Sequence, residues 1–152
     1  MTVEDKLQSL GLSLPDTPAP VASYVPAMRS GALIFSSGQL PTRNGTLAYV
    51  GQVETDVSTD DAYQAARLAA LNALAAIKSV AGSLDTIAQI VRVTGYVNCG
   101  NGFGQQPAVV NGASDFLIEV FGEQGKHARS AVGVAGLPLN APVEIELVVE
   151  VR

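Results

Sequence analysis

The strongest constraint on the fold lies at the end of the chain, in the run from Val143 to Val151. Five apolar residues occupy every second position, and three glutamates stand between them. These are Val143, Ile145, Leu147, Val149 and Val151 against Glu144, Glu146 and Glu150. A period of two is typical of a half-buried strand, so one face of this segment is expected to pack on a core.

A second β-like segment begins at His127 and is joined to the final strand by a turn that contains proline and asparagine. The two segments carry a cation, Arg129, and a carboxylate, Glu144, on what we expect to be neighbouring strands. A fixed pair of that kind can bind a small zwitterion or carboxylate. On pattern alone, the other glutamates of the final strand are predicted to be a solvated face.

The composition predicts one domain, residues 1–152, that associates with itself. Apolar residues make up 47% of the chain and charged residues only 15%, which is more apolar surface than a domain of this size can hide alone. Residues 1–20 contain several prolines and are predicted to be a surface extension. The net charge of −5 and the lack of a Lys/Arg run disfavour general nucleic-acid binding.

Three features predict a cytoplasmic protein. Cys99 is the only cysteine, so no intramolecular disulfide forms. The residues Met1 to Lys6 are acidic and lack the apolar region of a secretion signal. No apolar run reaches the roughly 18 to 20 residues of a membrane span, so no membrane association is expected.

The order of the predicted elements indicates an α+β fold. Strands are predicted at 21–28, 32–37, 46–50, 90–99 and in the two C-terminal segments, and helices at 58–80 and from 107 to 122. Helices of this length between strands favour right-handed crossovers, and therefore one mixed β-sheet with two helices on one face. In strand 90–99, Val91 and Val93 are predicted to share a face. The uncovered face of the sheet is predicted to be buried by oligomerisation.

Most familiar catalytic motifs are absent. The glycine-rich segment Gly100–Gly104 lacks the third glycine of a dinucleotide fingerprint and is predicted to be a mobile or ligand-edging loop. His127 is the only histidine, so no His/Cys metal cluster can be assembled and no nucleophilic triad is recognisable. Next to a helix end, this histidine is predicted to be a solvated or capping residue.

Several motifs taken together resemble the RidA family, the reactive-intermediate deaminases also called the YjgF family. The similarity runs from about Tyr24 to Val151. The motifs are Ser37-Gly38-Gln39 after a hairpin, Asn111, Ala128-Arg129-Ser130, Leu137-Pro138 and Val143-Glu144-Ile145-Glu146.

The resemblance implies a chorismate-mutase-like fold and a homotrimer with clefts between subunits. No metal or cofactor is expected, because the sequence lacks ligand clusters and cofactor-binding loops. The resemblance implies that Arg129 binds the carboxylate of a 2-imino or enamine acid and that Glu144 positions the water that releases ammonia. Tyr24 and Gly38 are expected in the cleft, and Asn111 and Ala131 are expected to contact the substrate.

The chain departs from the family pattern at Ala131, where typical active members carry a cysteine. It also departs in the loop Gly100 to Pro107, which is similar to a longer branch of the family.

The resemblance makes deamination of 2-aminoacrylate-like acids the first hypothesis for the function. The alternatives are a non-catalytic small-carboxylate binding or regulatory trimer and, less favoured, an endoribonuclease.

Overall fold

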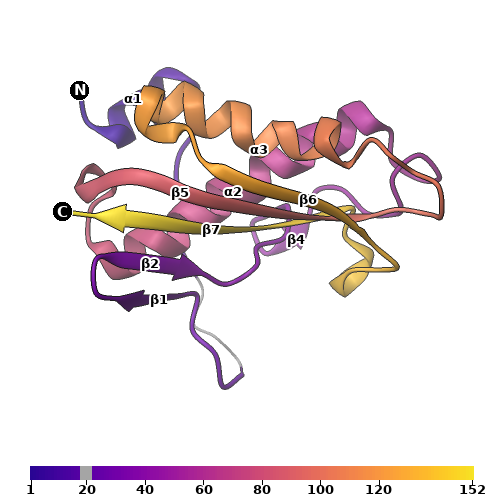
Figure 1. Ribbon diagram of the computed structural model, residues 1–152, viewed down its shortest axis with the longest axis horizontal. Coiled ribbons are helices and arrows are strands. Elements are labelled where there is room, and N and C mark those ends of the chain that lie inside the picture. Colours follow the sequence, from indigo (N-terminus) through magenta and orange to yellow (C-terminus); the bar gives the residue numbers. More distant parts are fainter. Residues whose placement is uncertain (18–21) are drawn as a thin grey trace.

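Five strands form one mixed sheet in the order β1-β2-β7-β5-β6, in a computed structural model that describes residues 1–17 and 22–152 (Figure 1). The strands of this sheet are β1 Ala27–Ser30, β2 Leu33–Ser36, β5 Ile87–Asn98, β6 Ala128–Val134 and β7 Val143–Val151. The helices are α1 Val3–Ser9, α2 Thr59–Ala81 and α3 Gln106–Phe121, with short 3-10 turns at Leu84–Thr86, Gly122–Gly125 and Pro138–Asn140. The end of the predicted extension and the start of the first predicted strand, residues 18–21, lie outside the described residues.

Both long helices cover the same face of the sheet, as predicted (Figure 1). Helix α2 begins where the Ser58 hydroxyl accepts a hydrogen bond from the Asp61 backbone N–H, and it ends at Gly82, whose φ of 82° favours glycine. The stripe of α2 that faces the sheet consists largely of alanines and is fully buried. Because these side chains are small, α2 lies close to both the sheet and α3. At the contact with α3, a Cβ on Gly112 would lie 1.9 Å from the Tyr63 carbonyl oxygen.

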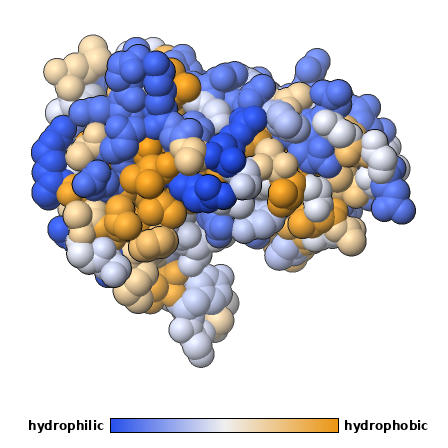
Figure 2. All heavy atoms as spheres, viewed as in Figure 1, coloured by the Kyte–Doolittle hydropathy of each residue, from blue (hydrophilic) through white to orange (hydrophobic). Residues whose placement is uncertain are grey.

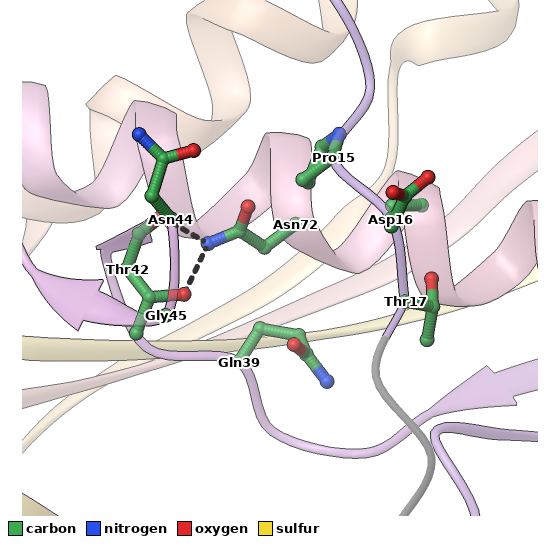
Figure 3. Close-up of a pocket in the computed structure, with 9 residues that line it drawn as sticks. Pro15, Asp16, Thr17, Gln39, Thr42, Asn44, Gly45 and Asn72 are labelled. Carbon is green, nitrogen blue, oxygen red and sulfur yellow. Dashed lines mark hydrogen bonds between the residues drawn. The ribbon is translucent and has the colours of Figure 1, made fainter.

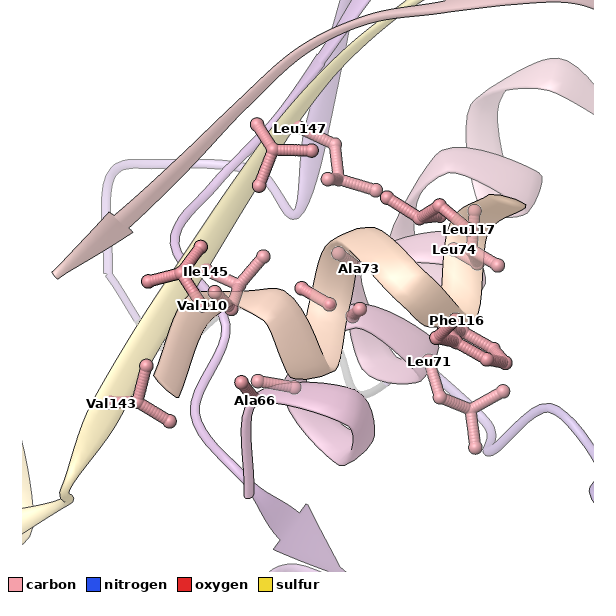
Figure 4. Close-up of a cluster of buried hydrophobic side chains, with 14 of the residues drawn as sticks. Ala66, Leu71, Ala73, Leu74, Val110, Phe116, Leu117, Val143, Ile145 and Leu147 are labelled. Carbon is pink, nitrogen blue, oxygen red and sulfur yellow. The ribbon is translucent and has the colours of Figure 1, made fainter. Parts of the chain in front are cut away.

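The core fills the layer between the helices and β7 (Figure 4). Phe116 and Leu117 of α3 meet Leu74 of α2, and Ile145 and Leu147 come from the sheet. The predicted alternation of β7 is confirmed, since its five alternating apolar residues are buried and its glutamates are not. The fold thus follows from the spacing of apolar residues, which has a strict period of two in one strand and a period near 3.6 in two helices.

One detail of the predicted strand faces is wrong. Val91 does not share the buried face with Val93, because the register of β5 against β7 shifts between Ile90 and Arg92. At this β-bulge Val91 is the extra residue, and Ile90 takes the core position with no exposed surface.

The predicted strand at 46–50 is not part of the main sheet. The short strand β4 Thr46–Leu47 pairs only with β3 Thr42–Arg43 in a separate two-stranded sheet.

The two C-terminal strands are not neighbours, contrary to the prediction. Strand β6 is parallel to β5 at the edge of the sheet, whereas β7 is antiparallel to β5 on its other side. The physical reason is the crossover β5-α3-β6, which returns the chain to the same sheet beside the strand that it left. The chain then passes from β6 across the end of β5 to begin β7, so Arg129 and Glu144 are on strands separated by β5.

The sheet face away from the helices carries exposed apolar side chains. Met28 of β1 and Phe35 of β2 lie opposite each other and are 58% and 43% exposed, and Val132 of β6 is 43% exposed. Figure 2 shows apolar surface gathered over β1, β2 and β7, crossed by hydrophilic residues. In the described parts of the chain, we find no helix with the length and apolarity needed to span a membrane.

Candidate functional site

Arg129 projects from the edge strand β6 toward helix α3. Its Nη1 donates hydrogen bonds to Asn111 Oδ1 at 2.7 Å and to Ser114 Oγ at 3.2 Å. The two acceptors are three positions apart and therefore share one face of α3. Both are neutral, and no described carboxylate forms a salt bridge with Arg129. The guanidinium is thus held in place while its charge stays uncompensated within the subunit.

Glu144 is the second residue of β7 and lies against Gly38. A Cβ added to Gly38 would lie 2.7 Å from both Cδ and Oε2 of Glu144, so only glycine leaves the carboxylate its present position. The segment is held there because the backbone of Gln39 exchanges two hydrogen bonds with Ile145, at 2.8 and 3.0 Å. Burial, and then the charge of Glu146, raise the pKa of the Glu144 carboxyl above its usual value.

Glu146 was predicted to be solvated, but in the structure it has a hydrogen-bond partner. The Tyr96 hydroxyl on β5 donates a hydrogen bond to Glu146 Oε1 at 2.8 Å. This bond and burial raise the pKa of Tyr96. Because Tyr96 lies directly opposite Glu144 in the β5–β7 register, these three side chains form one polar cluster on the open face of the sheet. Sequence alone did not reveal it, because the cluster depends on which strand pairs with β7.

Arg129 and Glu144 point to opposite faces of the sheet. Arg129 is opposite Val93, which is completely buried beneath the helices. Glu144 is opposite Tyr96 and alternates with buried residues, so it faces away from the helices. Partners in a register share a face. One subunit therefore does not bring the predicted cation and carboxylate together around one ligand.

The sequence analysis predicted one contact of His127 and missed another. As a capping residue, the histidine contacts the carbonyl oxygen of Gly125, at the end of the 3-10 turn after α3, through Nδ1 at 2.6 Å. It is half-buried, and its Nε2 lies 2.8 Å from Ser114 Oγ, a contact that the sequence did not predict. Ser114 is only 8% exposed and also accepts from Arg129. The spacing of Asn111 and Ser114 on α3, together with Arg129 two residues after the histidine, was the available signal.

The other predicted site residues are spread over the molecule. Tyr24 is 60% exposed, in a segment before β1 that projects from the sheet (Figure 1). Ala131 lies two positions after Arg129 on β6, on the same face of the strand, opposite Gly95.

The loop after β5 borders an open hollow of about 320 Å³ whose lining includes Cys99 and Gln106. Among the described residues, no group of three His, Cys, Asp or Glu side chains is placed to hold a metal ion.

A larger hollow, of about 370 Å³, lies elsewhere (Figure 3). Its lining comes from the N-terminal extension, the β3–β4 hairpin and α2, and it includes neither Arg129 nor Glu144. Its most buried polar residue, Asn72, is used structurally, since its amide donates to the carbonyl oxygens of Leu40 and Thr42 at 2.9 and 3.0 Å. This hollow is therefore separate from the predicted chemistry.

Comparison with known proteins gives consistent matches over nearly the whole chain. Residues 4–151 match the family described as YjgF/chorismate mutase-like, putative endoribonuclease. Protein TCP17 of Trypanosoma cruzi is 39% identical over 99% of this chain and 94% of its own. A 2-iminobutanoate/2-iminopropanoate deaminase of Dermatophagoides farinae is 30% identical over 93% and 95% of the two chains. The crystal structure of Atu1372 from Agrobacterium tumefaciens, a protein of unknown function, has a TM-score of 0.92 and 43% identity over 99% and 94% of the chains.

Proposed function

Because the chain belongs to the YjgF/chorismate mutase-like family, we propose that it hydrolyses reactive 2-imino and enamine acids to 2-keto acids and ammonia. The observation that carries the proposal is the guanidinium of Arg129. It is fixed by two neutral side chains and forms no salt bridge with the residues that the structure describes. A guanidinium of this kind binds a planar carboxylate through two parallel hydrogen bonds. The relative from Dermatophagoides farinae, named as a deaminase, supports this substrate class.

The reaction needs one water molecule and no oxidant or reductant. An enamine acid first becomes the imine by moving one proton from its nitrogen to its terminal carbon. The water oxygen then bonds to the imine carbon, the carbon–nitrogen bond breaks, and both water protons end on nitrogen, which leaves as ammonia. Glu144 is the group that orients this water and accepts its proton first. Its raised pKa makes it a stronger base than an ordinary carboxylate, while Gly38 leaves room beside it.

We further propose that the site is assembled between subunits of a homotrimer. Within one subunit Arg129 and Glu144 face opposite sides of the sheet, so a shared ligand requires Arg129 of one copy and Glu144 of another. Met28, Phe35 and Val132 expose apolar surface on the open sheet face, and a second copy of the chain would bury this surface. The 60% exposure of Tyr24 supports a contact of this residue with a neighbouring subunit. Light scattering is expected to give a mass near three times the 15.7 kDa of the chain.

Two alternative functions predict different roles for the site residues. A carboxylate-binding or regulatory trimer uses Arg129 in the same way but requires no water chemistry from Glu144. An endoribonuclease is suggested by the family description and by the name of a similar solved structure, a putative endoribonuclease from Shewanella oneidensis. The net charge of −5 does not favour it, because RNA binding gains affinity from basic surfaces. The single histidine does not favour it either, because it leaves no histidine pair for acid–base cleavage.

The deciding experiment generates unstable imino acids in the assay with an amino-acid oxidase and measures ammonia and keto-acid release. The wild type is expected to exceed the spontaneous rate, and Glu144→Gln is expected to lower turnover by about 10²-fold while pyruvate still binds. A wild type that binds pyruvate by calorimetry but never accelerates hydrolysis would identify a binding module instead. Cleavage of RNA that is abolished by Arg129→Ala would favour the endoribonuclease.

A further inference from the structure

A chain of hydrogen bonds runs from the backbone of the turn after α3 to the guanidinium of Arg129. His127 Nδ1 lies 2.6 Å from the Gly125 carbonyl oxygen, and His127 Nε2 lies 2.8 Å from Ser114 Oγ. Ser114 Oγ in turn lies 3.2 Å from Arg129 Nη1. Gly125 and Ser114 are both buried, so the chain is anchored at its far end and in its middle.

The chemistry of the groups sets the direction of each hydrogen bond. A carbonyl oxygen only accepts, so His127 Nδ1 carries a proton and donates it to Gly125. In a neutral imidazole Nε2 is then an acceptor, and the Ser114 hydroxyl donates to it. The lone pairs of Ser114 Oγ remain available for the N–H of Arg129. Each group therefore has a complementary partner.

We propose that Ser114 and His127 are positioning residues that hold the guanidinium of Arg129 in the orientation in which it binds a carboxylate. The inference rests on the proposed function, in which Arg129 is the carboxylate-binding group. Asn111 and Ser114 both engage Nη1, which leaves Nη2 and Nε, the other edge of the guanidinium, for two parallel bonds to a ligand.

His127 is needed because a serine inside a helix has a competing acceptor. Such a hydroxyl commonly donates to the carbonyl oxygen one turn earlier in its own helix. His127 Nε2 offers a better-placed acceptor and fixes the hydroxyl proton away from Arg129. Both ring nitrogens of His127 are engaged in this way, so the histidine acts through Arg129 and is not itself the base of the reaction.

Two substitutions of the same residue separate the positioning role from a merely structural one. In His127→Gln the side-chain amide reaches the place of Nε2 and keeps an acceptor for Ser114. In His127→Asn the shorter amide reaches only the place of Nδ1 and keeps the bond to Gly125. Both remove the ring, so effects of lost packing are shared. The probe is pyruvate, titrated by calorimetry, with KM and kcat for imine hydrolysis and thermal unfolding measured in parallel.

We expect His127→Gln to bind pyruvate within about threefold of wild type, and His127→Asn and Ser114→Ala to bind about tenfold more weakly, as for one hydrogen bond to a charged group. KM should rise with the dissociation constant while kcat changes little. Equal affinities in wild type and all variants, or equal losses in His127→Gln and His127→Asn, would overturn this inference and leave the proposed function standing. A wild type that does not bind pyruvate would remove both.

Discussion

The substitution Gly38→Ala tests whether the position of the Glu144 carboxylate matters for the chemistry. Gly38 is not in the left-handed backbone region, so alanine fits its backbone without strain. The new methyl group would lie 2.7 Å from Cδ and Oε2 of Glu144, whereas ordinary contact begins at 3.4 Å. The carboxylate must therefore move by about 0.7 Å or rotate away from its present site.

A displacement of this size has a large effect on rate and a small effect on stability. Misplacing a reacting group by about 1 Å costs on the order of 10²-fold in rate. We therefore expect kcat to fall by roughly 30- to 100-fold. The free energy of unfolding should change by less than about 1 kcal/mol, because Glu144 is only half-buried and can turn away.

The assay is imine hydrolysis with the imino acid generated in place, and urea unfolding reports stability. Gly136→Ala is the matched control, since a Cβ there meets nothing within 4 Å and the backbone is not in the left-handed region. The control should retain wild-type kcat. If Gly38→Ala does so too while folding normally, Glu144 is not the group that positions the water.

Three further outcomes follow from the same site. Arg129→Lys keeps the charge but loses the planar geometry, so carboxylate binding measured by calorimetry should weaken by roughly 1.5 to 3 kcal/mol; unchanged affinity would exclude Arg129 as the clamp. Because the folded state raises the pKa of Glu144 above the ordinary 4.5, ionisation of this group opposes folding. Glu144→Gln should thus unfold at higher urea than wild type at pH 7, with no such gain below about pH 4.5; a loss at pH 7 would contradict the pKa direction. Glu146→Gln removes a charge that raises this pKa, so the acid limb of kcat/KM should move to lower pH, whereas Glu150→Gln, an exposed neighbour, should leave the pH profile unchanged.

Much of the fold was predictable because its determinants are local in sequence. The strand Val143–Val151 was predicted with its observed bounds, since one face alternates strictly with the other. The helix predicted at 58–80 is observed as Thr59–Ala81, since a capping serine and a glycine mark its ends. The position of β5 between β6 and β7 was missed, because pairing of strands distant in sequence leaves no local pattern. The crossover rule for two strands joined by a helix contained that information and would have placed β6 beside β5.

The candidate site was predicted as residue types but not as an arrangement. The spacing of Arg129 and Glu144 was visible in sequence, whereas the faces they occupy depend on the strand order. The contact between His127 and Ser114 was missed, because the two residues are 13 positions apart and Ser114 looks like an ordinary helical serine. Glu146 was read as solvated because its partner, Tyr96, lies 50 residues away on a strand whose register was unknown.

The central claim, that the site combines Arg129 of one subunit with Glu144 of another, is tested most directly by mixing two inactive variants. Arg129→Ala and Glu144→Gln are unfolded together in equal amounts, refolded, and assayed for imine hydrolysis. In a random trimer about a quarter of the interfaces then contain both intact residues, so about a quarter of wild-type activity should return. If the mixed protein is trimeric but no more active than either variant alone, the site does not form across subunits and the account is wrong.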